Sequence, residues 1–283
     1  MIVDGHVHDF SLKIVANVTK KKEMTRILCL ETKEAKERIG IANLKKRMQV
    51  CNIDFSLLLP TASVEMIEKV NSKFIKTAMQ HKCLFTAGTL HPEFENIEKE
   101  LKRLAENNIK ALKLCSFSQG FQLNSKETFT LFNKIQNYNT NNDYSFFIIL
   151  DTFTLAHEYF NTDPENTTTP ELIQTLVKKY PEINFVAAHM AGLLAPFSNI
   201  KKHISKYDNL FLDTSNATHT LSQHEFIDLI KIQGPEKIIF GTDWPWFDFL
   251  TESEILKNLL NKAGFSKHQK EMIFGYNIHN LIQ

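Results

Sequence analysis

Three features typical of membrane or secreted proteins are missing from this 283-residue sequence. The longest uninterrupted apolar stretch, residues 146–150, is far shorter than the roughly 20 residues that cross a bilayer. The N-terminus, MIVDGHVHDF, has neither the basic nor the apolar region of a secretion signal. The four cysteines form no Cys-x-x-Cys pair, which argues against a disulfide framework or a thiolate zinc knuckle and predicts reduced thiols in a cytoplasmic protein.

An excess of one charge is also absent. Lysine and arginine number 33 against 32 aspartates and glutamates, so the formal charge of +1 predicts neither a nucleic-acid partner nor binding to a membrane surface. Hydrophobic residues make up 43% of the chain, which is enough for a large buried core and excludes wholesale disorder. Two enzyme motifs are missing as well, the Gly-x-Ser-x-Gly elbow of serine hydrolases and the phosphate-binding P-loop.

Short apolar runs alternate with longer segments of helical periodicity along the chain. The runs mostly do not alternate with polar residues, which is typical of parallel strands covered on both faces. We expect strands at residues 2–7, 55–59, 84–89, 111–114, 146–150, 185–188, 210–212 and 237–240. Eight strands separated by helices predict an α/β fold, a single (β/α)8 TIM-barrel domain over residues 1–283. The alternative, an open dinucleotide-binding sheet, would carry Gly-x-Gly-x-x-Gly after its first strand, and none is present.

Two long insertions, residues 9–37 and 152–169, follow the first and fifth expected strands. Both leave from the carboxyl ends of strands, the face on which barrels build their sites. In the second insertion, Asp163-Pro164 and the threonines at 167–169 predict a polar surface loop and a candidate lid.

The first expected strand ends in two histidines, His6 and His8. Side chains alternate along a strand, so these imidazoles point the same way and can bind one metal ion. Asp151, His189 and Asp243 each directly follow another apolar run and would emerge at the same rim of a barrel. An aspartate after a strand is also a common helix cap or turn former, and that reading stays open for Asp151 and Asp243.

Taken together, these motifs resemble the amidohydrolase superfamily, in particular its amidohydrolase-related (amidohydrolase-2) branch of metal-dependent hydrolases and decarboxylases. The resemblance rests on DGHVH at residues 4–8, HMAG at 189–192 and FGTDWP at 240–245, with IFGYN at 273–277 similar to the closing helix of that branch. The motifs span the chain, and their order and spacing are more specific than any one of them.

The resemblance implies a barrel that holds one divalent metal ion, most often zinc. His6, His8, His189 and Asp243 would be ligands or lie beside the ion. This branch usually has a histidine ligand at the end of the fifth strand, where this sequence has Asp151. A carboxylate there would make a fifth candidate ligand and shift the preference toward manganese, or would mark a weakened or lost site.

Substrate contacts follow from the same resemblance. Lys113 and Cys115 lie where relatives often show Lys-Leu-His, so Lys113 is expected to bind a substrate carboxylate and Cys115 to be an altered contact or a packing residue. Some superfamily members bridge two metals with a carboxylated lysine, which is a less favoured role for Lys113. Trp244 and Trp246 would form a wall against a flat apolar substrate, or pack around Pro245.

The implied reaction is hydrolysis of an amide, ester or lactone bond of a small-molecule substrate by metal-activated water. Asp243 and His189 would be the catalytic residues, the first accepting a proton from water and the second polarising a carbonyl or passing a proton to the leaving group. Two alternatives remain open: a nonoxidative decarboxylase on the same scaffold, and a catalytically degenerate, metal-free binding barrel. Relatives often dimerise, so the resemblance also implies a homodimer.

Overall fold

Parallel strands form the centre of the molecule, and the computed structural model describes all of residues 1–283. Hydrogen bonding joins them in the orders β1-β2-β3 and β4-β5-β6-β7-β8-β9. Only Ala87 separates β3 from β4, so these two are halves of one strand and eight strands surround the axis, as the sequence predicts. The strands are β1 Val3–Val7, β2 Phe55–Leu58, β3 Leu84–Thr86, β4 Gly88–Thr89, β5 Ala111–Leu114, β6 Phe147–Leu150, β7 Phe185–Ala187, β8 Leu210–Asp213 and β9 Ile238–Ile239.

The first and last strands meet and close the barrel. The backbone N–H of Gly5 donates to the carbonyl of Phe240 at 2.8 Å, and that of Asp243 donates to the carbonyl of His6 at 3.0 Å. Glycine is required at this seam, because a Cβ on Gly5 would lie 2.6 Å from the side chain of Ile239. The closed, all-parallel arrangement is the predicted (β/α)8 TIM barrel.

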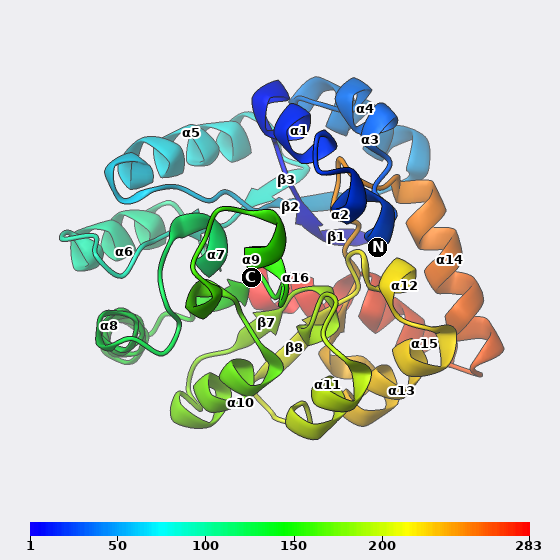
Figure 1. Cartoon of the computed structure of the whole chain (residues 1–283). Helices are drawn as coiled ribbons and strands as arrows, with labels where there is room; N and C mark the ends of the chain where they lie inside the picture. The colour runs from blue at the N-terminus through cyan, green and yellow to red at the C-terminus, as the bar shows by residue number, and fades with distance from the viewer.

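Helices surround the strands, and α1–α4 gather on one side of the barrel (Figure 1). A helix follows each strand because the connection between two parallel strands must cross back over the sheet. Pro170 occupies the first position of α10, where its missing N–H costs no hydrogen bond, and the Thr169 side chain caps that helix by accepting from the N–H of Leu172. The helices are α1 Leu12–Thr19, α2 Lys22–Ile27, α3 Thr32–Glu37, α4 Ile41–Cys51, α5 Ile67–Gln80, α6 Ile97–Glu106, α7 Ser116–Gln119, α8 Lys126–Asn142, α9 Ala156–Tyr159, α10 Pro170–Lys179, α11 Phe197–His203, α12 Ala217–Thr220, α13 Gln223–Gln233, α14 Phe249–Lys262, α15 Lys267–Glu271 and α16 Asn277–Ile282.

Both faces of the strands are buried, which explains their continuous apolar runs. On β6, Ile148 and Leu150 belong to the large core cluster that also contains residues of the surrounding helices. Phe147 and Ile149 belong to a second cluster, which holds alternate residues of several strands and Ile278 of α16. The period of two along each strand therefore separates two apolar layers. No helix is both long enough and apolar enough to span a bilayer.

The structure overturns the sequence expectation for part of the second insertion. Residues 9–37 fold into α1, α2 and α3 and pack over the carboxyl ends of the strands. In the second insertion Thr167 and Thr168 are buried, so the expected polar surface loop is wrong at these positions. The reason is a hydrogen bond between the hydroxyls of Thr168 and Ser116 at 3.1 Å, which anchors this segment to the barrel.

Candidate metal centre

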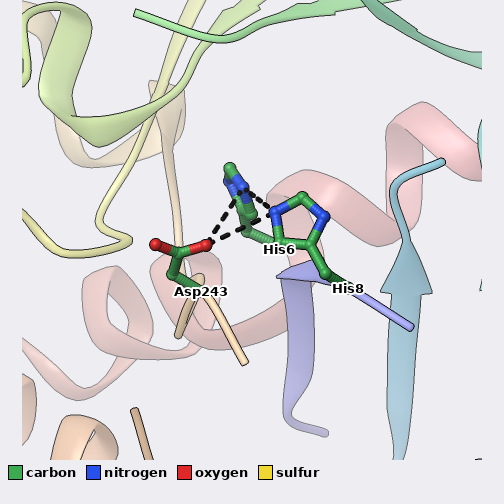
Figure 2. A group of neighbouring side chains, drawn as sticks. All are labelled: His6, His8 and Asp243. Atoms are coloured by element: carbon green, nitrogen blue, oxygen red, sulfur yellow. Dashed lines mark hydrogen bonds and ion pairs between the residues drawn. The ribbon is translucent and has the colours of Figure 1, made fainter. Parts of the chain in front are cut away.

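Two strand ends bring together three donor atoms. His6 Nε2 and His8 Nε2 lie 3.1 Å apart, and Asp243 Oδ1 lies 3.8 Å from the first and 3.4 Å from the second. We call His6, His8 and Asp243 the donor triad; Figure 2 shows its three side chains converging. The expectation that the two histidines point the same way is confirmed.

The hydrogen bonds behind each imidazole explain why a cation fits here. His6 Nδ1 lies 2.8 Å from a carboxylate oxygen of Asp213, and His8 Nδ1 lies 3.1 Å from the carbonyl of Leu59. Both partners are acceptors, so each Nδ1 donates to its partner and the two Nε2 atoms are left facing each other. Burial lowers the pKa of His6 to about 4, although Asp213 opposes this, so its ring is neutral at pH 7. Two imidazole nitrogens and a carboxylate oxygen that face one another at this spacing are the donor atoms that a divalent metal ion binds, and the set therefore fits such an ion.

Asp4 connects the strand that carries His6 and His8 to the segment that carries Asp243. Its carboxylate accepts from the Thr242 hydroxyl at 2.6 Å, the Thr242 N–H at 3.1 Å and the His6 N–H at 2.9 Å. Burial raises the pKa of Asp4 to about 7, against the effect of these hydrogen bonds. The backbone of Asp243 itself adopts a left-handed conformation with φ of 62°, which is strained for a residue other than glycine. The fold thus holds Asp243 in one place in the segment after β9.

Asp213 and Ser215, which the sequence interpretation did not include, support the centre from β8. One Asp213 oxygen binds His6, and the other accepts from the N–H of His189 at 3.0 Å and the N–H of Ser215 at 3.1 Å. The Ser215 hydroxyl also donates to Asp213. Burial opposes ionisation of Asp213, but its histidine and serine neighbours outweigh burial and lower its pKa. A carboxylate behind a ligating histidine fixes the ring tautomer and orientation.

A second charged group, Lys113, Asp151 and His189, lies beside the donor triad. Asp151 Oδ2 is 3.6 Å from Lys113 Nζ and 3.8 Å from His189 Nε2. Burial disfavours the Asp151 carboxylate, but Lys113 and His189 lower its pKa overall. Burial likewise disfavours a charged His189, yet Asp151 raises its pKa to about 9. The structure does not bring Asp151 into the donor triad, because its carboxylate is paired with these two cationic groups.

His189 occupies an intermediate position. Its ring centroid lies 5.0 Å from that of His6, and its Nδ1 is 2.9 Å from the carbonyl of Ser215. Together with His6 and Asp213 it forms a second cluster of metal-binding side-chain types, but its Nε2 faces Asp151. This geometry favours a proton-transfer role for His189 over ligation in the donor triad.

A cavity of about 230 Å³ opens beside these groups. Its polar lining comes from His8, Thr61, Lys113, Ser118, Asp151, His189, Asn216 and Asp243. Most of the remaining lining is apolar, and the first insertion supplies much of it through Phe10, Ile14, Val18, Met24, Leu28 and Leu30. The cavity thus combines a charged end with an apolar enclosure of the size of one small ring.

The cavity corrects one expected substrate contact. Trp244 does not line it; its ring stacks on Phe249 with centroids 4.9 Å apart and belongs to the large core cluster. Trp246 lines the cavity instead and packs near Phe10. Cys115 lines the cavity as expected, and burial raises the pKa of its thiol well above the ordinary value, so the thiol is neutral.

A period-two signal would have identified Asp213. Phe211 belongs to the same apolar layer as Ile149, and Asp213 and Asp151 each follow two residues later. Because alternate strand residues share a face, both carboxylates were predictable from their strands as groups at the same barrel end. Ser215 and Asn216 carry no comparable signal, since they lie in the irregular segment after β8.

Comparison with known protein families shows to which family this barrel belongs. A family model described as "Amidohydrolase" matches residues 62–282. This chain belongs to the amidohydrolase family. The match begins after the histidine pair at residues 6 and 8, so those histidines are evidence independent of it. No curated protein matches the sequence.

Solved structures share the fold of this amidohydrolase. An uncharacterized TIM-barrel protein from Bordetella bronchiseptica has a TM-score of 0.74 at 16% identity, over 99% of this chain and 98% of its own. A dihydroxybenzoic acid decarboxylase from Polaromonas sp. JS666, with bound manganese and the inhibitor 2-nitroresorcinol, has a TM-score of 0.71 at 16% identity, over 99% and 96%. A candidate 2-pyrone-4,6-dicarboxylic acid hydrolase from Pseudomonas putida has a TM-score of 0.64 at 13% identity, over 99% and 97%. At these identities the likeness establishes the shared TIM-barrel fold.

Proposed function

We propose that this amidohydrolase is a metal-dependent hydrolase that cleaves an amide, ester or lactone bond of a small molecule. The observation that carries the proposal is the donor triad, in which two imidazole Nε2 atoms and a carboxylate oxygen face one another at 3.1 to 3.8 Å beside the cavity. His6, His8 and Asp243 would hold one divalent ion. Two imidazoles and one carboxylate suit zinc, and manganese is the alternative.

A bound divalent ion would lower the pKa of water toward neutrality and polarise a substrate carbonyl. Asp243, which also lines the cavity, accepts the proton of the attacking water. His189 carries a proton on the nitrogen that faces Asp151, and it passes this proton to the leaving group as the bond breaks. Lys113 binds a substrate carboxylate through its ammonium group.

The apolar part of the cavity contributes binding and excludes water. Phe153 and Trp246 line it together with the helical first insertion. Flat apolar substrates gain from contact with such walls, and the electrostatic interactions at the charged end strengthen when water leaves.

Nonoxidative decarboxylation is the second candidate. The observations that favour it are the aromatic lining of the cavity, the ammonium of Lys113 and the name of the Polaromonas relative. In that reaction the bond between the ring carbon and its carboxylate breaks, carbon dioxide leaves, and His189 or Asp243 supplies the proton that replaces it.

The test is a product assay on protein reconstituted separately with zinc and with manganese. Small aryl esters, lactones, anilides and hydroxybenzoic acids are incubated with the protein, and hydrolysis products and carbon dioxide are quantified by mass spectrometry. Hydrolysis that depends on the metal and is lost in His6→Ala supports the proposal, and the surface variant Asp228→Asn should behave as the parent protein. Metal-dependent carbon dioxide release without hydrolysis would favour the second candidate, and failure to bind either ion would refute both and leave a metal-free binding barrel.

A further inference from the structure

One polar side chain that lines the cavity has no role in the chemistry described so far. Asn216 is 1% exposed, and neither its amide nitrogen nor its amide oxygen has a hydrogen-bond partner in the protein. A buried polar group without a partner destabilises the fold. Asn216 therefore has an unmet donor and an unmet acceptor beside the candidate substrate site.

The local structure does not explain why the amide nitrogen and oxygen of Asn216 lack hydrogen-bond partners. It precedes α12 at the position where asparagine commonly caps a helix, but its side chain makes no capping hydrogen bond. Its backbone is left-handed, with φ of 56°, a conformation that favours glycine. A strained residue with an unpaired amide at a cavity is typical of a ligand-binding position.

The geometry of a carboxamide restricts what can satisfy it. Its N–H donor and its C=O acceptor lie side by side, so the matching group must present an acceptor next to a donor on one edge. A carboxylate, an ester and a lactone offer only acceptors, whereas the cis amide of a lactam or cyclic imide offers both. Lys113 also lines the cavity, and its Nζ forms no hydrogen bond, although Asp151 Oδ2 lies 3.6 Å away; this ammonium group matches a carboxylate on the same molecule.

We propose that Asn216 determines the specificity of the site by pairing its amide with a donor and an acceptor on one edge of the substrate, and that the substrate is a cyclic amide bearing a carboxylate. This inference rests on the proposed function, because it takes the cavity beside the donor triad as the substrate site. The cavity of about 230 Å³ accommodates one such ring.

Two isosteric probes test the proposal. The lactam 6-oxo-1,6-dihydropyridine-3-carboxylate and the lactone 2-oxo-2H-pyran-5-carboxylate differ only by a ring N–H in place of a ring oxygen. Their dissociation constants are measured by equilibrium dialysis against the manganese-loaded protein, with the intact probe quantified on both sides. We expect the lactam to bind at least ~10-fold more tightly, since the lactone leaves the Asn216 oxygen unpaired.

Glycine variants isolate the side chain. Asn216→Gly removes the amide and suits the left-handed backbone, and the preference for the lactam should fall to within ~2-fold. Asn52→Gly is the matched control, because Asn52 is also left-handed, with φ of 54°, but exposed at the end of α4; it should keep the full preference. Manganese content is measured for each variant, to show that the donor triad is intact.

Equal affinity of the parent protein for the two probes, including no measurable binding of either, would overturn the role of Asn216. Persistence of the preference in Asn216→Gly would overturn it as well. Ring opening of the probes, counted in the same samples, reports separately on hydrolysis. A lactam preference without ring opening would refute hydrolysis of these bonds and leave the role of Asn216 supported.

Discussion

Replacement of Asp213 with asparagine should weaken divalent-ion binding, although Asp213 is outside the donor triad. The carboxylate holds His6 Nδ1 at 2.8 Å with one oxygen and accepts from the backbone of His189 and Ser215 with the other. Asparagine has one oxygen and one NH₂ group, so it must present a donor either to His6 Nδ1–H or to the two backbone N–H groups. Whichever way the amide turns, His6 loses part of what fixes its ring.

The expected loss is roughly 10- to 100-fold in affinity for zinc or manganese, the range for carboxylate partners of ligating histidines. This corresponds to about 1.4–2.7 kcal/mol of binding free energy. The assay is competitive titration of metal-free protein with a chromophoric chelator at pH 7. Asp228→Asn is the control, because Asp228 is an aspartate at the surface, paired only with Lys201.

A dissociation constant for Asp213→Asn within twofold of the parent value, in a variant with unchanged circular dichroism, would contradict the reasoning. It would mean that the position of His6 is set by the barrel seam alone. An affinity loss in Asp228→Asn of equal size would point to a general charge effect instead.

Two further predictions concern other aspartates that form ion pairs. Asp151→Asn should lower zinc affinity by less than ~10-fold, because Asp151 is paired with Lys113 and does not belong to the donor triad. Loss of a triad histidine should lower it by more than ~100-fold, and equal losses for the two kinds of variant in chelator titration would make Asp151 a ligand. Asp248→Asn should destabilise the protein by about 1 kcal/mol at pH 7, because Asp248 forms a two-point ion pair with Arg47 at 2.6 and 2.7 Å. Burial raises the pKa of Asp248 but the Arg47 hydrogen bonds outweigh it, so the pKa lies below its ordinary value. The ion pair therefore contributes its full stabilisation above pH ~4, and this stabilisation is lost as the pH falls through the folded-state pKa of Asp248. A difference in thermal unfolding between the parent protein and Asp248→Asn that stays constant down to about pH 3 would contradict this.

Local pattern was sufficient to predict most of the barrel. All eight strands were expected, because each is buried on both faces and so reads as a short continuous apolar run. The first insertion was missed as a helical segment, since α2 and α3 span only six residues each and show too few turns for a periodic signal. The buried threonines at 167 and 168 were missed because a polar sequence does not reveal a hydrogen-bond partner elsewhere in the chain.

For the site, the sequence by itself determined which residue types stand at the strand ends, including His6, His8 and Asp243. Strand periodicity and the parallel order of the strands are local properties, and they bring these ends to one rim. Only the tertiary structure decided how they pair: that Asp213 supports His6, that Asp151 is paired with Lys113, and that Trp246 rather than Trp244 lines the cavity. Such pairings join residues that are far apart in the chain. Which atoms meet depends on distances of a few ångströms, and no local pattern in the sequence encodes these distances.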